Sequence, residues 1–372
     1  MKNSEDIFKE FCDERNLRKN SIKSYKSALN SYCEYHKTDL KELLKEAFEE
    51  EKEIPLNVRK IKGQLKNYQK YLIYDKKLAI TTIKDWFGKI KTFYKHNEVE
   101  LPYIPTIKMD RKIEKYEDIP KLKDIKIALK TTKNPLEKAI ILFMATSGTA
   151  KKETLNLTIN DFINATKEYH NSNKIIEVIK TLENKNEIIP TFEIIRTKTN
   201  RLYYTSCSDE ATKLILKYLK TRKELKNEDK LFKISDDGLM KFFRRINNEN
   251  NWGKVNHYCF FHSHGLRKFN ATTIEDKAFA NLIQGRKLDP TTESYFKQNP
   301  KRTKEKYLQH LHKFKINPSK NDKKYLTTEE KIDRIEKDLN ETKRNLNEIK
   351  KELKTQNRKF DKLLAILNEI NK

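Results

Sequence analysis

The sequence predicts a mainly α-helical protein with one small β-sheet, an α+β fold class. Apolar residues recur at spacings of three and four over most of the chain, as they do on amphipathic helices. Strand-like runs are confined to the middle of the sequence. Glycine is scarce, at 7 of 372 residues, which leaves little material for tight hairpins. Together these observations favour helical domains over a sandwich or barrel.

Residues 1–108 are expected to form a helical domain of their own. Helices are predicted from 21 to 33, with Asn20 or Ser21 as the N-cap, from 58 to 74, and from 81 to 96. In the last of these, one face carries Ile83, Phe87, Ile90, Phe93 and Tyr94. Such a face needs a core to pack against.

A linker and a second domain, over residues 109–326, are expected next. Pro102 and Pro105 interrupt the helical pattern and a polar stretch follows, so the chain between the domains lies there. The second domain is expected to begin near residues 116–120.

Within the second domain, the elements are predicted from apolar runs and their ends. An apolar helix from Pro135 to Thr146 is followed by Gly148, which can take the left-handed position after a helix. Strand-like runs occur at 175–179, 192–195 and 201–205, and the last two flank Lys198 as a hairpin would. Helices are expected to return from Asp209 to Arg222 and to continue through Tyr295.

The last segment, residues 327–372, predicts a coiled coil. Core positions alternate at spacings of three and four, and Thr327 to Glu330 supply a capping box. These positions are Ile332, Ile335, Leu339, Thr342, Leu346, Ile349, Leu353, Gln356, Phe360, Leu363, Leu367 and Ile370. With 12 Lys+Arg and 10 Asp+Glu, the segment has a net charge of 12 − 10 = +2. The alternative is a long surface helix folded back on its own domain.

The charge of the chain points to a polyanionic partner. Lys+Arg number 80 against 54 Asp+Glu, a net charge of +26, and almost all of this excess lies in the first 326 residues. Such an excess favours nucleic acid, or an anionic membrane surface, as the partner. A lysine-rich proteome is the simpler explanation of the same number.

Several functional classes lack sequence support. Neither a GxGxxG nor a GxxxxGK[ST] run is present, so no nucleotide cofactor is expected. The cysteines Cys12, Cys33, Cys207 and Cys259 lie far apart, which fits neither a zinc site nor a disulfide framework. No apolar run of membrane-spanning length occurs. We therefore expect a cytoplasmic, DNA-associated protein without a metal or cofactor.

Two short runs carry residues suited to phosphodiester chemistry. His264-Gly265-Leu266-Arg267 supplies an imidazole and a guanidinium, and Thr291-Thr292-Glu293-Ser294-Tyr295 ends in a phenol. A tyrosine that attacks a phosphodiester must lose its proton, and the charge that builds up on the phosphate needs cations already in place. Arginine suits this task because its planar fork binds two phosphate oxygens and keeps its charge.

These runs, in this order, resemble the tyrosine recombinases, the phage-integrase family. The resemblance implies that Tyr295 is the nucleophile, that Arg267 grips the scissile phosphate and that His264 acts in acid–base or hydrogen-bonding roles. Gly285-Arg286 is similar to the family's Gly-His or Gly-Trp. The resemblance therefore implies that Arg286 is a further hydrogen-bond donor to the phosphate. Glu193 to Thr199 resembles the hairpin that bears the catalytic lysine, so Lys198 is the candidate general acid.

The resemblance also implies the domain types and partners. Residues 1–108 resemble the SAM-like core-binding domain and 109–326 the catalytic domain of the family. The implied function is site-specific DNA recombination through a 3′-phosphotyrosyl intermediate, on double-stranded DNA and without a cofactor. Integration of a mobile element by four protomers is the expected use, with the coiled coil helping to gather them, and resolution of chromosome dimers is the alternative. The degenerate boxes and the tail suggest an archaeal or archaeal-virus type of integrase.

One box departs from the family pattern. Residues 145–157 resemble the box Thr-Gly-Leu-Arg-x-x-Glu-Leu, aligned by Gly148, Glu153 and Leu157, and the alignment puts Ala150 where the first catalytic arginine belongs. Lys151 is the next cation along. Two alternatives follow: a DNA-binding protein on a recombinase scaffold whose catalysis is weakened or lost, and a coiled-coil scaffold that meets nucleic acid incidentally.

Overall fold

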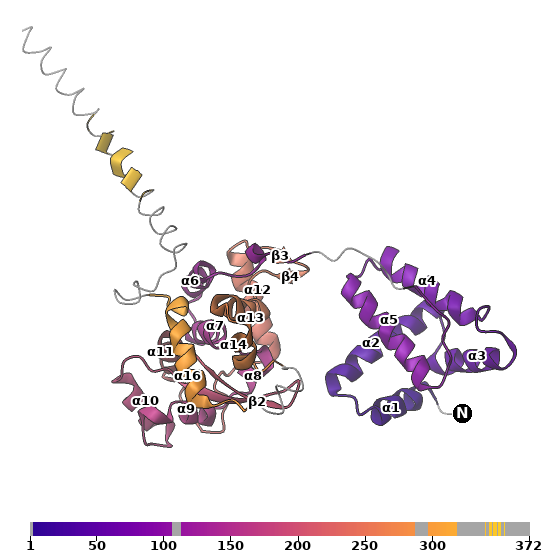
Figure 1. Cartoon of the computed structure of the whole chain (residues 1–372), viewed down its shortest axis with the longest axis horizontal. Coiled ribbons are helices and arrows are strands. Elements are labelled where there is room, and N and C mark those ends of the chain that lie inside the picture. Colours follow the sequence, from indigo (N-terminus) through magenta and orange to yellow (C-terminus); the bar gives the residue numbers. More distant parts are fainter. Residues whose placement is uncertain are drawn as a thin grey trace, which may run out of the picture. The chain divides into compact units, whose positions relative to one another are not determined.

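The chain folds into two compact units. The computed structural model describes residues 3–105, 113–286 and 297–317, with residues 339, 342–343, 345–347, 349–350 and 353 of the tail. The N-terminal unit is Met1–Ile113 and the C-terminal unit is Glu114–Lys372 (Figure 1). Each has a hydrophobic core of its own. The observed architecture is mainly helical with small antiparallel sheets, as the sequence predicts.

The described part of the N-terminal unit is entirely helical. Its helices are α1 (Ser4–Glu14), α2 (Lys19–His36), α3 (Leu40–Glu53), α4 (Lys60–Tyr74) and α5 (Ile80–His96). The predicted apolar face of α5 is buried and packs on α2 and α4. The predicted N-cap of α2 is wrong. The helix begins at Lys19, because the carbonyl of Arg18 already accepts the amide of Ile22, which places Asn20 and Ser21 inside the first turn.

The C-terminal unit combines helices with two short hairpins. Before the main hairpin lie η1 (Tyr116–Asp118), α6 (Leu122–Thr131), α7 (Pro135–Ser147), α8 (Lys151–Asn156), α9 (Ile159–Ala165), η2 (Lys167–Tyr169) and α10 (Ile175–Glu183). The hairpin is β1 (Thr191–Arg196) and β2 (Arg201–Ser206). After it come α11 (Asp209–Leu219), α12 (Asp236–Glu249), β3 (Lys254–Val255), β4 (Tyr258–Cys259), α13 (Ser263–Ile274), α14 (Lys277–Ile283), α16 (Pro300–His310) and η3 (Leu311–Phe314).

Helix α7 lies at the centre of this unit. Its residues from Ala139 to Ser147 are all buried, and α6, α11 and α13 pack around it (Figure 1). A helix that is apolar on every side is stable only inside a core, which explains its position. Gly148 ends α7 in the left-handed conformation, with φ of 67°, as predicted. The loop that starts there is therefore fixed to the most buried element of the unit.

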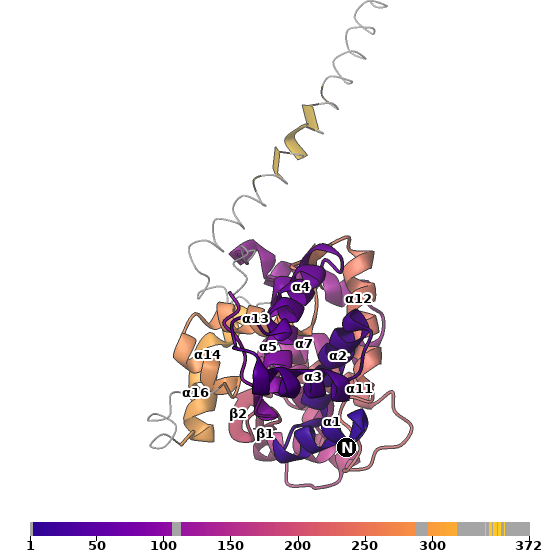
Figure 2. The same cartoon turned by 90° about the vertical axis from the view of Figure 1, so that its right-hand side faces the viewer.

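The hairpin β1–β2 forms where the sequence predicts it. Phe192 pairs with Thr205 and Arg196 with Arg201, which leaves residues 197–200 as the turn. Phe192 and Ile194 point into the core and Ile195 is exposed, the alternation of a strand with one buried face. Strand β2 packs against α14 and α16, and Figures 1 and 2 show α16 beside it.

Two secondary-structure expectations differ from the structure. Residues 175–179 form the first turns of helix α10, so the predicted strand is wrong: Ile175, Val178, Ile179 and Leu182 make one buried helical face. Run length alone had favoured a strand over a helix there. The hairpin β3–β4 interrupts the helices that were expected to continue from residue 209, because Gly253, Asn256 and His257 all adopt positive φ.

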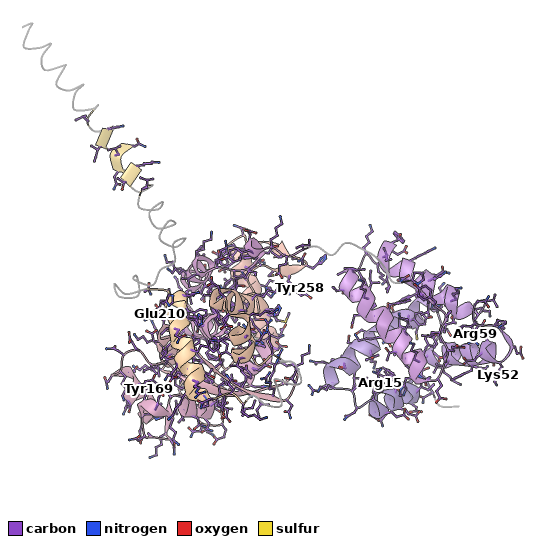
Figure 3. All side chains as sticks on the ribbon, in the orientation of Figure 1. Arg15, Lys52, Arg59, Tyr169, Glu210 and Tyr258 are labelled. Carbon is purple, nitrogen blue, oxygen red and sulfur yellow. The ribbon has the colours of Figure 1, made fainter. Side chains whose placement is uncertain are left out.

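The chain beyond η3 is anchored before the tail. The carboxylate of Glu210 on α11 accepts hydrogen bonds from the amides of Ile316 and Asn317, at 2.6 and 2.8 Å (Figure 3 labels Glu210). Most of the predicted coiled coil lies outside the described residues. The tail residues that are described are helical, and the side chains of Leu339, Leu346, Ile349 and Leu353 are 50–60% exposed.

Candidate active site

Arg267 forms the centre of the site. It lies in the second turn of α13 and is 4% exposed. One terminal nitrogen donates to the carbonyl of Gly148 at 2.7 Å, and the other donates to the carbonyl of Gln284 at 2.6 Å. The guanidinium therefore joins the loop after α7 to the turn after α14. This juxtaposition brings together the segments that the sequence motifs singled out.

The turn at residues 284–286 receives three arginines. The carbonyl of Gln284 accepts from Arg267, that of Gly285 accepts from Arg196 at 2.6 Å, and that of Arg286 accepts from Arg201 at 2.5 Å. Gly285 has a φ of 57°, and a β-carbon there would come within 2.5 Å of the ring of Tyr203. Only glycine lets the turn approach the hairpin this closely. The hairpin thereby delivers two cations to the end of α14.

A buried amide network supports this geometry. Asn270 donates to the carbonyl of Thr146 at 2.9 Å and accepts from Gln284 Nε2 at 3.0 Å. Gln284 Nε2 also donates to the carbonyl of Arg267 at 2.9 Å. Both amide side chains are fully buried, so these bonds are costly to lose. The network fixes α13, the end of α7 and the turn in one arrangement.

The electrostatics of the cluster favour an anion. Burial is the main cause that lowers the pKa of Arg267 to about 10; the charges of Arg196 and Arg286 act in the same direction, and Tyr203 and Glu153 oppose them. Burial and then Arg196 likewise lower the pKa of Arg286. Burial comes first in both cases, so each guanidinium has lost much of the water that would solvate its charge, and the neighbouring arginines add repulsion. A bound anion such as a phosphate would stabilise these charges.

Glu153 is the buried acid beside these arginines. Its Oε1 accepts the amide of Thr197 at 3.3 Å, and among the described residues Oε2 has no hydrogen-bond partner. The charge of Glu153 raises the pKa of both Arg267 and Tyr203. One carboxylate thus faces several guanidiniums and leaves the cluster net positive.

His264 lies in the first turn of α13 and is exposed. Partial burial lowers its pKa, and Lys268, His262, Arg267 and Arg286 lower it further. The imidazole is therefore neutral at pH 7, in the form that can accept a proton. His264 and Arg267 lie on one helix, and the charges of Arg267 and Arg286 act on the imidazole.

Of the other predicted site residues, the structure describes Lys198 and Arg286. Lys198 is exposed in the turn between β1 and β2. Arg286 is the last residue of the turn at 284–286, and its Nε donates to Gln284 Oε1 at 3.0 Å. Tyr295 lies outside the described residues. The structure thus gathers Arg267, Arg286 and His264, with Lys198 on the adjoining hairpin.

Ala150 and Lys151 differ in what they can contribute. Ala150 is the N-cap of α8 and has only a methyl group to offer. The ammonium of Lys151 pairs with Asp236 Oδ1 at 2.5 Å, at the start of α12. Lys151 is therefore occupied by a carboxylate and does not supply the missing charge at the arginine cluster.

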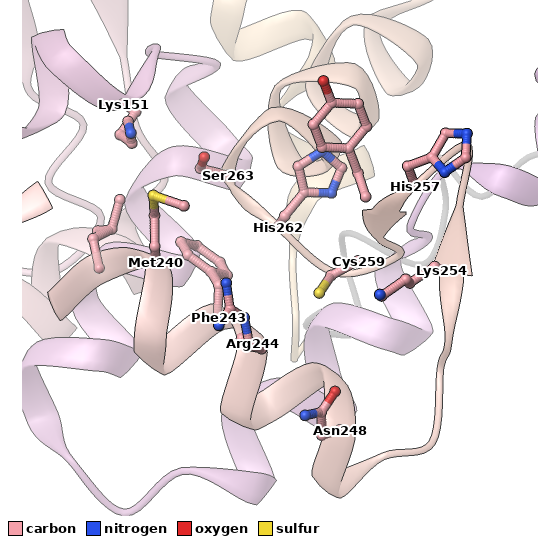
Figure 4. Close-up of a pocket in the computed structure, with 12 residues that line it drawn as sticks. Lys151, Met240, Phe243, Arg244, Asn248, Lys254, His257, Cys259, His262 and Ser263 are labelled. Carbon is pink, nitrogen blue, oxygen red and sulfur yellow. The ribbon is translucent and has the colours of Figure 1, made fainter. Parts of the chain in front are cut away.

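A basic cavity of about 650 Å³ adjoins the start of α13. It is bounded by α12 on one side and the β3–β4 hairpin on the other (Figure 4). Its cationic and imidazole side chains are Lys151, Arg244, Lys254, His257 and His262. Tyr258, which also lines the cavity, is 69% exposed (Figure 3 labels Tyr258). Exposed cations and an aromatic ring are suited to a nucleic-acid backbone and its bases.

Sequence reasoning missed Arg196, Arg201, Asn270 and Gln284 as parts of the site. Arg196 is detectable in retrospect. It stands two residues after the buried Ile194 on β1, so strand alternation directs it to the inner side. The amides have no such signal, because their partners are backbone carbonyls more than 100 residues away or across a turn.

Comparisons with known proteins were made at three levels. No model of a known protein family matches the chain, and no curated protein does. Among solved structures, the chain is similar to XerH site-specific recombinase bound to palindromic difH substrate, a post-cleavage complex. The TM-score is 0.49 and the sequence identity 16%, and the match covers 82% of this chain and 83% of that chain. It is also similar to a lambda integrase tetramer bound to a Holliday junction, with a TM-score of 0.49 and 12% identity over 79% of this chain and 76% of that chain.

A third similar structure is the Tn1549 transposon integrase in complex with circular intermediate DNA, with a TM-score of 0.46 and 11% identity over 82% of this chain and 98% of that chain. These structural neighbours are tyrosine recombinases. At such identities the roles of individual residues rest on the geometry of this chain.

No group of three or more histidine, cysteine or acidic side chains within the described residues is arranged to hold a metal ion. No helix in the described ranges is both long and apolar enough to cross a membrane.

Proposed function

We propose that this chain is a site-specific DNA recombinase that cuts and rejoins strands through a phosphotyrosine. The observation that carries the proposal is the cluster of Arg267, Arg196 and Arg286 around the turn at 284–286, beside a neutral His264. It is a preformed, under-neutralised cation site of the kind that a phosphodiester in attack requires.

The proposed reaction uses no cofactor. The phenol oxygen of Tyr295 attacks the phosphorus, and the bond between the phosphorus and the 5′ oxygen breaks. The phosphate then links Tyr295 to the 3′ oxygen of the cut strand. His264 accepts the tyrosine proton, and Lys198 gives a proton to the leaving 5′ oxygen. Arg267 and Arg286 stabilise the charge on the phosphate. Attack by another 5′-hydroxyl reverses the steps and releases Tyr295.

The proposed substrate is double-stranded DNA. The net charge of +26 and the basic cavity beside α13 support it, since phosphate contacts dominate affinity for duplexes. Integration of a mobile element is the proposed use, with four protomers on DNA. The exposed apolar side chains of the tail support the proposed coiled-coil contacts between them.

A second candidate function is DNA binding without cleavage. Ala150 favours it, because the resemblance places a catalytic arginine there and Lys151 is paired with Asp236. Loss of one such cation removes on the order of a hundredfold or more in rate.

Covalent trapping separates the two functions. Wild type and Tyr295→Phe are incubated with duplexes from the flanks of the gene, which carry a nick near the centre so that the released strand diffuses away. A denaturing gel reports the adduct and a native gel reports binding. We expect an adduct with wild type alone. Salt-sensitive binding by both proteins without any adduct would instead establish the second function.

A further inference from the structure

We propose that Arg196 is the second phosphate-gripping arginine of this site, in the role that no side chain at position 150 can fill. The inference rests on the proposed function for its ligand, a phosphodiester. It assigns a role to a residue of the hairpin that the sequence motifs do not mark.

The geometry places Arg196 next to Arg267. Their guanidiniums donate to the adjacent carbonyls of Gly285 and Gln284, both at 2.6 Å. A guanidinium has five N–H donors, so one bond to a carbonyl leaves most of the fork available. Two planar forks on neighbouring peptide groups can bind the oxygens of one tetrahedral anion.

The charges give the same result. Arg196 lowers the pKa of Arg267 and of Arg286, so its positive charge is close to both. No salt bridge to Arg196 occurs among the described residues, although many other cations of the unit have one. An arginine held beside two others without an acid of its own is stabilised by a bound anion.

The position of α8 explains why Arg196 takes this part. Gly148, whose carbonyl binds Arg267, is two residues from Ala150, and Glu153 on α8 accepts the amide of Thr197, the residue after Arg196. The start of α8 and the end of β1 therefore meet at the same cluster. Arg196 on β1 therefore supplies the positive charge that the methyl group at position 150 cannot.

A purely structural role is the competing explanation, and Arg201 provides its control. Arg201 clamps the next carbonyl of the same turn, that of Arg286, at 2.5 Å, but it is not among the charges that shift the pKa of Arg267. If the bond to the turn is all that matters, Arg196→Gln and Arg201→Gln will behave alike.

The first experiment measures anion binding, which needs neither DNA nor Tyr295. Tungstate, a tetrahedral dianion, is titrated by calorimetry into the full chain, into Arg196→Gln, Arg196→Lys and Arg201→Gln, and thermal melts verify folding. We expect Arg196→Gln to weaken tungstate binding about 10- to 100-fold, as for loss of a hydrogen bond to a charged group. Arg196→Lys should recover part of the loss, and Arg201→Gln should cost less than about threefold.

The second experiment asks whether Ala150→Arg suppresses the defect of Arg196→Gln. Arg196→Gln should abolish the covalent adduct on the nicked duplexes while the gel shift persists, and Ala150→Arg in the same chain should restore adduct. Ala150→Arg should not restore adduct to Arg267→Gln. Here the restored arginine acts from α8, so a structural clamp at Gly285 cannot account for the recovery.

The outcomes are separable. Tungstate binding that needs Arg196 in a protein that forms no adduct would refute cleavage and leave the assigned role standing. Equal tungstate affinities of folded Arg196→Gln and wild type, equal losses in Arg196→Gln and Arg201→Gln, or no tungstate binding by wild type would each overturn the inference.

Discussion

The side-chain amide of Asn270 lies where a β-carbon on residue 148 would have to be, since such an atom would come within 2.2 Å of Asn270 Oδ1. Glycine at 148 therefore does two things. It takes the left-handed end of α7, and it makes room for the amide network that holds Arg267. The motif residue Gly148 is a packing requirement of the site.

Gly148→Ala should destabilise the protein by about 3 kcal/mol or more, because it combines left-handed strain with displacement of Asn270. Gly253→Ala is the matched control, since Gly253 has a φ of 68° and open space around it. It should cost only the strain of about 1–2 kcal/mol. Denaturant unfolding of both variants measures the difference, and equal losses would contradict the packing argument.

Arg267→Lys should cut the rate of adduct formation on the order of a hundredfold, while binding to the same duplex changes by a few-fold. An ammonium cannot bridge the carbonyls of Gly148 and Gln284 and also present a fork to phosphate. Quenched time courses with a nicked duplex give the rate. A lysine variant as fast as wild type would remove Arg267 from the chemistry.

The fall in the adduct-forming rate at low pH, the acid limb of the pH–rate profile, should reflect protonation of His264. Its pKa is lowered from an ordinary value of 6.5, so wild type should keep its adduct-forming rate as the pH falls through 6.5 and lose it at lower pH. Lys268→Gln removes a charge that lowers this pKa, so the pKa of His264 rises. The acid limb should move to higher pH, while Lys268→Arg leaves it in place.

Binding to duplex DNA should weaken steeply with salt, with a log–log slope of about −0.9 for each phosphate contacted. Lys254→Gln removes one cation of the cavity beside α13 and should reduce the slope by about one contact. Lys217 on α11 does not line that cavity and serves as the control substitution. Equal slopes for Lys254→Gln and wild type would take the cavity out of the DNA-binding surface.

Deleting residues 327–372 should lower the number of chains per particle, which light scattering in the absence of DNA gives as the measured molar mass divided by the mass of one chain. Leu346 and Leu353 are about half exposed on a helix, so a second copy of the helix is the expected cover. Leu346→Glu with Leu353→Glu should reproduce the deletion. An unchanged number of chains per particle would favour the alternative, a helix that packs on its own chain.

How far the sequence could predict the fold is shown by two apolar runs. Residues 135–146 have helical length, a proline at the start and a glycine after the end, and each signal agrees with α7. Residues 175–179 are too short for their period to be read, and only Leu182, beyond the run, reveals the helical face of α10. Short β-branched runs take their form from the core that receives them.

The site was predictable in part for a related reason. Arg267, His264 and Arg286 stand in recognisable motifs, but the bonds that aim Arg267 end on backbone carbonyls, which have no sequence identity. Arg196 was overlooked because the motif draws attention to Lys198, although the alternation of β1 already turned Arg196 inward.

The end of α7 has a consequence for how activity is lost. The carbonyls of Thr146 and Ser147 accept bonds from Asn270, from Tyr307 on α16 and from Thr205 on β2. Four segments distant in the chain are thus tied at one buried point, three to four residues before Ala150. Amide exchange at this point requires opening of the whole unit rather than local fraying. On heating, the protein should therefore show no temperature range in which the C-terminal unit stays folded while the arginine cluster is disrupted; both should be lost in one cooperative step.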